Sequence, residues 1–219
     1  MSAEEDLRKR LAAVGRDLYA AGLTHDASGN ISARVPGSSY CLIKPSGYRF
    51  CDLEPKHFIV VDIQSRRVLD GEAKPSIETP FHTKLYQLWP EACGVVHIHP
   101  KYSTIMSIAG LEIVPMGLDI FLAPALANGI PMSKFAPPGT EELADNLVEA
   151  MKDHVACLMP HHGLTAIGKT IEEAANNAKV VERLAELHYN ILQVGVPQSL
   201  PRSMLDTLVI RAKDRGLLV

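Results

Sequence analysis

Apolar residues recur at intervals of three and four along several stretches of the chain, which is the period of an amphipathic helix. The first stretch covers residues 3–21 and is followed by Gly22, a typical residue at the end of a helix. Thr140 precedes a later stretch as an N-cap residue. The same spacing predicts further helices over 77–88, from about Ser103, over 140–152 and over 171–192.

Other stretches alternate between apolar and polar residues or form short β-branched runs, which is typical of strands. They predict strands over 31–35, 40–44, 58–62, 68–69, 93–99 and 154–159, with 58–62 and 68–69 forming a hairpin. Because the early strands follow one another closely and helices are interleaved, the order favours an α/β sandwich with a mixed or antiparallel sheet. No Gly/Ser-rich or Pro-rich linker interrupts the chain, so residues 1–219 are expected to form a single domain.

Composition excludes several classes of protein. Apolar residues make up 47% and charged residues 21% of the chain, as in ordinary folded domains. A net charge of −3 favours neither a nucleic-acid nor an anionic membrane partner. No apolar run is long enough for a membrane span, and the acidic start does not resemble a signal peptide. Four cysteines without paired spacing predict free thiols and a cytoplasmic location.

The strand over 93–99 contains the most informative chemistry. His97 and His99 are separated by one residue, so a strand would project both imidazoles to the same side. Neighbouring neutral imidazoles suit a divalent cation. His161 and His162 follow a later strand, and adjacent side chains diverge, so one of them is expected to join the pair; the residues alone do not choose between them.

The remaining histidines are not close in sequence to another candidate metal ligand of this kind. They are interpreted as ordinary surface or core residues: His25, His57, His82, His154 and His188.

Small residues gather in three loops that separate predicted elements. Backbone amides and short polar side chains in such loops can form a phosphate cradle. The candidates are Gly29, Asn30, Ser46, Gly47 and Ser76. Ser76 is also expected at the N-terminus of helix 77–88, where an anion is favoured. Ordinary turns and helix caps remain the alternative for each loop.

Glu78 follows Ser76 directly and falls in the first turn of the predicted helix. It is either a surface carboxylate favoured by the helix dipole or the acidic partner of the three histidines. Three histidines without a pair of cysteines leave a coordination position open, as catalytic rather than structural zinc sites do.

The segment from Gly163 to Thr170 matches the G-x4-G-K-T pattern of nucleotide-binding loops. The residues between the glycines are apolar and indicate a short strand rather than a loop. Thr170 and Glu173 form a capping-box pattern for helix 171–192. We therefore predict that this segment is not a nucleotide site.

Taken together, these segments resemble the class II aldolase/adducin family, whose enzymes include L-fuculose-phosphate aldolase, rhamnulose-phosphate aldolase and L-ribulose-5-phosphate 4-epimerase. The resemblance runs from about residue 5 to residue 195. It rests on motifs in the family's order: Ser28-Gly29-Asn30-Ile31-Ser32, Ile43-Lys44-Pro45-Ser46-Gly47, Lys74-Pro75-Ser76-Ile77-Glu78, His97-Ile98-His99 and His161-His162-Gly163.

The resemblance implies a three-layer sandwich with a central, mostly antiparallel sheet flanked by helices, and a homotetramer. It implies that His97, His99 and His162 bind Zn2+ and that Glu78 moves the proton. Three imidazoles also suit another divalent transition metal, such as manganese, iron or cobalt. Gly29, Asn30, Ser46, Gly47 and Ser76 would hold the phosphate of a small phosphorylated sugar. The implied reaction is aldol cleavage of a ketose phosphate to dihydroxyacetone phosphate and an aldehyde, through a zinc-stabilised enediolate.

Some positions depart from the fuculose-phosphate aldolase pattern. Ile77 replaces the second of two serines before the glutamate, Ile120 stands where a tyrosine is common, and Arg215 stands near a second such position. These departures leave the sugar undetermined.

Two related activities therefore remain open. Lys44-Pro45-Ser46-Gly47 is closer to the 4-epimerase branch, which uses an aspartate in the region of Asp119 but also has aspartate in place of Glu78. Decarboxylases share the metal site as well. A non-catalytic, adducin-like role is disfavoured because all three histidines are present.

Overall fold

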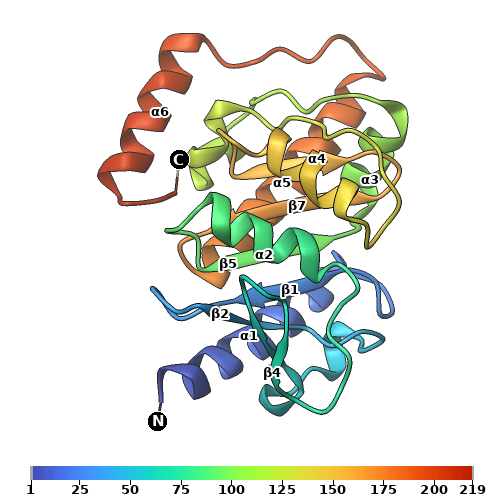
Figure 1. Cartoon of the computed structure of the whole chain (residues 1–219). Helices are drawn as coiled ribbons and strands as arrows, with labels where there is room; N and C mark the ends of the chain where they lie inside the picture. Colours follow the sequence, from blue (N-terminus) through green and yellow to red (C-terminus); the bar gives the residue numbers. More distant parts are fainter. Residues whose placement is uncertain (1, 219) are drawn as a thin grey trace.

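A seven-stranded sheet forms the centre of the protein, as the computed structural model shows for residues 2–218 (Figure 1). Its strands lie in the order β4-β3-β2-β1-β5-β7-β6, and every pair of neighbours is antiparallel. The strands are β1 (Asn30–Ala33), β2 (Tyr40–Ile43), β3 (Ile59–Asp62), β4 (Val68–Asp70), β5 (Gly94–Ile98), β6 (Ala156–Met159) and β7 (Gly163–Gly168). The predicted antiparallel α/β architecture is confirmed.

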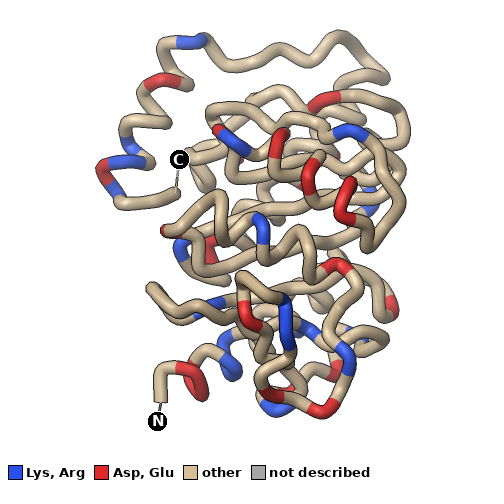
Figure 2. Tube along the Cα trace, viewed as in Figure 1, with Lys and Arg blue, Asp and Glu red and all other residues tan. Residues whose placement is uncertain are grey.

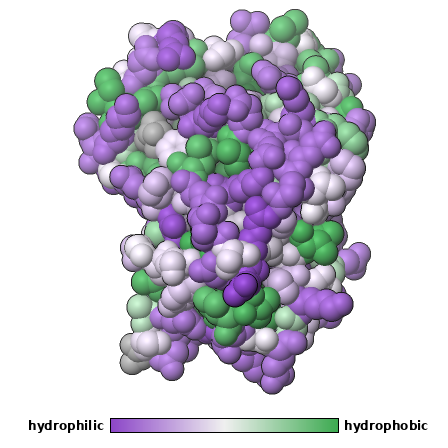
Figure 3. Space-filling model, in the orientation of Figure 1, coloured by the Kyte–Doolittle hydropathy of each residue, from purple (hydrophilic) through white to green (hydrophobic). Residues whose placement is uncertain are grey.

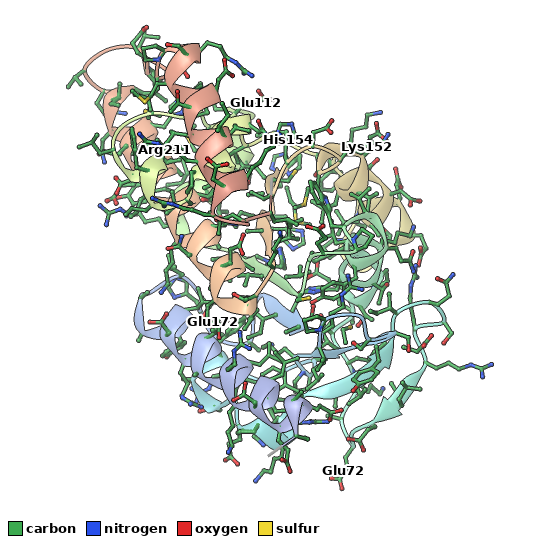
Figure 4. The ribbon with its side chains drawn as sticks, turned by 90° about the vertical axis from the view of Figure 1, so that its left-hand side faces the viewer. Glu72, Glu112, Lys152, His154, Glu172 and Arg211 are labelled. Carbon is green, nitrogen blue, oxygen red and sulfur yellow. The ribbon has the colours of Figure 1, made fainter. Side chains whose placement is uncertain are left out.

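Helices cover both faces of this sheet. They are α1 (Ala3–Ala20), α2 (Thr79–Leu88), α3 (Lys101–Ala109), α4 (Glu141–Ala150), α5 (Ile171–Ile191) and α6 (Arg202–Asp214). The α1 and α3 helices pack against α5 on one face, and α2 packs against α4 on the other (Figure 1). Seen from the side, Glu172 at the start of α5 and Lys152 just beyond α4 lie on opposite sides of the strands (Figure 4). This arrangement is the expected three-layer sandwich.

Most predicted elements occur within a few residues of their expected bounds. Thr140 caps α4 through a hydrogen bond from the Leu143 amide, at 3.1 Å. The helix predicted over 77–88 begins later, because Glu78 is its N-cap residue and Ser76 lies before the helix. The placement of Ser76 at the helix N-terminus was therefore wrong by two residues.

The capping box expected at the start of α5 is only half formed. The Thr170 hydroxyl accepts a hydrogen bond from the Glu173 amide, at 3.1 Å. The Glu173 carboxylate instead accepts from the amides of Lys169 and Leu218, both at 3.1 Å. It thereby ties the end of the described chain to the start of α5.

The sequence pattern did not predict α6, although Leu205, Leu208 and Ala212 on it are buried at helical spacing. This helix packs against the 3-10 turn Pro124–Asn128 and stands at the outer end of the molecule (Figure 1). Its short apolar stripe is interrupted by charged residues, which made it a weak signal.

The segment that matches the nucleotide-loop pattern is the strand β7. It pairs with β5 on one side and β6 on the other, so its backbone amides form hydrogen bonds within the sheet. A Cβ atom on Gly168 would lie 2.5 Å from the Ala174 nitrogen. The glycine therefore permits close packing of strand and helix, and the predicted short strand is confirmed.

Basic and acidic residues alternate over the surface rather than forming a field of one sign (Figure 2). The face shown in Figure 3 is largely hydrophilic, with separate hydrophobic patches. Within residues 2–218, no helix has the length and apolar content needed to cross a membrane.

Gly94 supplies a test of the packing between β5 and α5. A Cβ atom there would lie 2.6 Å from the Ile171 Cα atom, which belongs to backbone and cannot rotate away. We expect Gly94→Ala to lower the free energy of unfolding by about 1–3 kcal/mol, measured by urea denaturation. Gly195→Ala is the control, because that glycine faces open space. Equal stability of the two variants would contradict the close approach.

Candidate metal centre

Three imidazoles converge where β5 ends and β7 begins. His97 lies on β5, His99 follows the strand by one residue, and His162 immediately precedes β7. The Nε2 atom of His97 is 2.8 Å from that of His99 and 3.2 Å from that of His162. Antiparallel pairing of β5 with β7 thus brings residues 65 positions apart into one cluster.

Hydrogen bonding determines which nitrogen of His97 faces the cluster. Its Nδ1 donates to the Leu164 carbonyl at 3.0 Å, so the proton of the neutral ring is on Nδ1. The Nε2 lone pair then points toward His99 and His162. A backbone acceptor on the far nitrogen is the usual support of a metal-binding histidine.

Burial keeps all three imidazoles neutral. It lowers the pKa of His97 well below its usual value and that of His99 to about 4, and it also lowers the pKa of His162. The neighbouring imidazoles add to the effect on His97 and His99. Neutral imidazole is the form that binds a metal.

A buried carboxylate supports the position of His99. Glu182 on α5 accepts hydrogen bonds from the amides of Tyr102 and Ser103, both at 2.8 Å. These amides belong to the first turn of α3, which starts two residues after His99. The negative charge at the helix N-terminus is favourable, and it anchors the segment that carries His99 to α5.

Glu78 lies against the histidine cluster from the other side. Its Oε2 atom is 3.3 Å from His97 Nε2, and its Oε1 atom is 3.4 Å from His162 Nε2. The residue is only 5% exposed, and Oε1 has no hydrogen-bond partner. Burial raises the pKa of Glu78, against the opposing effects of the Asn30 hydrogen bond and the Lys44 charge. The interpretation of Glu78 as a mere surface carboxylate is wrong.

The donor set fits a divalent transition metal. Four-coordinate zinc with nitrogen bonds near 2.0 Å places ligand atoms roughly 3.3 Å apart. Each of the three histidines offers one ring nitrogen, and these atoms lie within 4.8 Å of one another. An unpartnered carboxylate oxygen faces the same point. These groups repel one another unless a cation or proton lies among them, so His97, His99 and His162 could hold a metal ion.

An open pocket of about 400 Å³ lies beside the cluster. All five residues expected to bind the substrate line it, together with Glu78, His99 and His162; the five are Gly29, Asn30, Ser46, Gly47 and Ser76. Residues from three separate sequence segments therefore meet at one cavity, next to the candidate metal ligands His99 and His162.

The two serine loops are joined by their backbones. The Ser46 amide donates to the Lys74 carbonyl at 2.9 Å, and the Ser76 amide donates to the Lys44 carbonyl at 3.2 Å. The expectation that these two amides would be available to an anion is therefore wrong. The serine hydroxyls remain on the pocket wall, held in place by the paired loops.

Gly29 is required by the close approach of its loop to β5. Its φ angle is +76°, and a Cβ atom would lie 2.6 Å from the His97 carbonyl oxygen. A larger residue would push the loop away from the strand that carries the histidines.

Lys44 is a buried cation on the pocket wall whose role the sequence left open. Its Nζ atom donates to the Ala27 carbonyl at 3.2 Å, and the side chain is almost inaccessible. Burial lowers its pKa to about 8, against the attraction of Glu78. The ammonium makes this wall of the pocket positive.

The structure separates His161 from His162. His161 is exposed, adopts a left-handed backbone with φ of +56°, and contacts the edge of the Phe135 ring. His162 turns inward to the cluster, as the family resemblance implied.

The other positions with an open role do not line this pocket. Asp119 pairs with Arg183 on α5 at 2.9 Å, Ile120 is fully buried, and Arg215 is exposed at the end of α6.

His82 is the residue that sequence reasoning missed. It was interpreted as an ordinary histidine, yet its Nε2 atom hydrogen-bonds the Asn30 side chain, which in turn bonds Glu78. Its position at i+4 from Glu78 on α2 was the available signal.

Comparison with known proteins agrees with this geometry. The family model described as Class II Aldolase and Adducin N-terminal domain matches residues 9–189. A 5-methylthioribulose-1-phosphate/5-deoxyribulose-1-phosphate aldolase of Rhodospirillum rubrum is 33% identical over 210 residues, covering 96% of this chain and 92% of the relative. A 3-oxo-tetronate 4-phosphate decarboxylase of Escherichia coli is 30% identical over 191 residues, covering 84% and 86%.

Among solved structures, an L-fuculose 1-phosphate aldolase superposes with a TM-score of 0.88 at 26% identity, covering 97% of this chain and 98% of that one. The chain belongs to the class II aldolase and adducin family.

Removal of one candidate ligand tests the metal centre. We expect His97→Ala and His162→Ala to lower metal affinity by more than the roughly 10–100-fold that loss of an outer partner causes. Elemental analysis after dialysis measures the bound metal. His161→Ala is the matched control and should retain it, because that residue is exposed and is not part of the three-histidine cluster. Full metal retention by either ligand variant would contradict the site.

Proposed function

We propose that the protein is a metal-dependent aldolase that cleaves a small phosphorylated ketose to dihydroxyacetone phosphate and an aldehyde. The observation that carries the proposal is the buried Glu78 carboxylate, 3.3–3.4 Å from two imidazoles of a three-histidine cluster and open to the adjoining pocket. The similarity to sugar-phosphate aldolases over nearly the whole chain supports it.

Zn2+ is the proposed cofactor, because three imidazoles and an open position suit it. When bound, the metal supplies Lewis-acid stabilisation of the negative charge that develops on the substrate's carbonyl oxygen. His97, His99 and His162 would hold it, and the pocket adjoins two of these histidines.

Glu78 is proposed to move the proton. In the cleavage direction the C3–C4 bond breaks as the Glu78 carboxylate takes the proton of the C4 hydroxyl, and the aldehyde leaves. The electron pair left on C3 then takes a proton, which Glu78 delivers to that carbon. A carboxyl group whose pKa is raised by burial is suited to this exchange.

The pocket wall is proposed to bind the phosphate. Ser46, Gly47 and Ser76 lie on the joined loops, and Asn30 and Gly29 line the same cavity. The Lys44 ammonium makes the region attractive to an anion. The exposed Ile77 at the pocket replaces a hydroxyl with an apolar contact.

A substrate panel tests the reaction class. We expect the metal-loaded enzyme to release dihydroxyacetone phosphate from at least one of 5-deoxyribulose 1-phosphate, 5-methylthioribulose 1-phosphate and L-fuculose 1-phosphate, in a coupled assay. Release of carbon dioxide from 3-oxo-tetronate 4-phosphate would instead indicate the decarboxylase alternative. Interconversion of pentulose phosphates without cleavage would indicate the epimerase alternative.

Glu78→Gln separates proton transfer from metal binding. The variant keeps the size of the side chain but cannot carry the proton, so kcat should fall by roughly 10²–10⁴-fold. Bound metal, measured by elemental analysis, should remain at the wild-type level. An unchanged kcat would remove Glu78 from the chemistry.

We also propose that the chain forms a homotetramer and acts in the cytoplasm. Several large apolar side chains are exposed, among them Leu118 at 82% and Val194 at 88%, and a partner subunit would cover them. All four cysteines are free thiols, which suits a reducing compartment. Light scattering should give about four times the 23.9 kDa chain mass. A monomeric mass would contradict the assembly.

A further inference from the structure

A continuous line of buried polar side chains runs from the candidate base into the core. Asn30 Nδ2 donates to Glu78 Oε2 at 2.7 Å, and Asn30 Oδ1 hydrogen-bonds His82 Nε2. His82 Nδ1 lies 2.7 Å from the Ser32 hydroxyl, which lies 2.8 Å from the Tyr86 hydroxyl. We call these four residues, Asn30, His82, Ser32 and Tyr86, the polar chain.

The polar chain is almost completely removed from water. His82 and Ser32 are fully buried, Tyr86 is 1% exposed and Asn30 is 4% exposed. Two residues come from β1 and two from α2, so the chain crosses the contact between sheet and helix. Each polar atom in such a place must find a partner within the protein, because an unpaired one costs about 1–3 kcal/mol.

The partners determine the direction of every hydrogen bond. Because Asn30 turns its amide nitrogen to Glu78, its oxygen must accept from His82, and His82 must carry its proton on Nε2. Burial lowers the pKa of His82 to about 3, so the ring is neutral and Nδ1 accepts the Ser32 proton. The Ser32 oxygen then accepts the hydroxyl proton of Tyr86. All four hydrogen bonds therefore point toward Glu78.

We propose that His82 is a positioning residue for the reaction, which orients the Asn30 amide so that it donates to Glu78 and holds that carboxylate in place for proton transfer. This inference rests on the proposed function. No atom of His82 lines the substrate pocket, so it acts through Asn30 rather than on the substrate.

The physical argument is that an asparagine amide can rotate by 180° and exchange its donor for its acceptor. The reversed amide would present oxygen to the Glu78 carboxylate, and two acceptors would then face each other. His82 with its proton on Nε2 prevents this exchange, and Ser32 with Tyr86 prevents the proton of His82 from moving to Nδ1. The second hydrogen of the amide remains available to a ligand in the pocket.

A purely structural role would have a different signature. If the polar chain only satisfied buried groups, its disruption would lower stability and leave the turnover of the folded enzyme unchanged. A positioning role requires that the effect on turnover depends on the Glu78 carboxylate. Double-mutant cycles measure such dependence.

Ser32→Ala is the main variant, because it removes one oxygen three hydrogen bonds away from Glu78 and touches neither metal nor substrate. We expect kcat to fall roughly 10-fold, part of the ~10²–10⁴-fold that general acid–base catalysis contributes. Bound metal should stay unchanged. In the Glu78→Gln background, the same substitution should change kcat by less than about 2-fold, because the carboxylate it positions is absent.

Two substitutions of His82 test which of its ring nitrogens positions the Asn30 amide. Glutamine can place an amide near the position of Nε2 and donate to Asn30, whereas asparagine reaches only to the position of Nδ1. We expect His82→Gln to retain more kcat than His82→Asn. His188→Gln is the control, because this buried histidine on α5 is not part of the polar chain.

A spectrum supplies a readout independent of turnover. Long-range 1H–15N correlation of the histidine side chains in metal-loaded protein should show His82 protonated on Nε2 and unprotonated on Nδ1. A proton on Nδ1 would overturn the proposal. So would equal effects of Ser32→Ala in both backgrounds, or equal kcat for the two His82 variants. Absence of turnover by the wild type on every substrate would contradict the proposed function, and the spectrum would still decide on the polar chain.

Discussion

The pairing of β5 with β7 is the interaction on which the rest of the site depends. It places His97 opposite Thr165, and the Leu164 carbonyl accepts the hydrogen bond that orients the His97 ring. His162 lies immediately before β7 and so comes close to His97. Gly163 has no room for a side chain against the Ile98 carbonyl and His99, so the two strands meet closely at their ends. The cluster is therefore a consequence of strand register, and a shift by one residue would turn His97 to the other face.

Burial gives this cluster its chemistry. The same desolvation that keeps the imidazoles neutral also raises the pKa of Glu78 and lowers that of Lys44. A polar site inside an apolar core is unfavourable unless every group is partnered. The protein meets this requirement through Glu182 on one side and the polar chain on the other. The Oε1 atom of Glu78 is an exception, because it is buried near His162 without a hydrogen-bond partner.

Much of this could be predicted from local signals. Periodicity identified the helices and strands that build the three layers, since one face of each must be apolar. The spacing of His97 and His99 predicted a shared side because strand geometry imposes it. The helix α6 was not predicted because its buried apolar stripe is short. A complete capping box was expected at Thr170, but the Glu173 carboxylate bonds the distant Leu218 amide instead.

By itself, the sequence determined the elements, the pair of histidines and the loops of small residues, because these depend on neighbours along the chain. The choice of His162 over His161 came from the family resemblance rather than from local pattern. Only the tertiary structure decided that the Ser46 and Ser76 amides are already used and that His82 is connected to Glu78. The physical reason is the same in each case. Which partner satisfies a buried polar group depends on the strands and helices that surround it, and those come from distant parts of the chain.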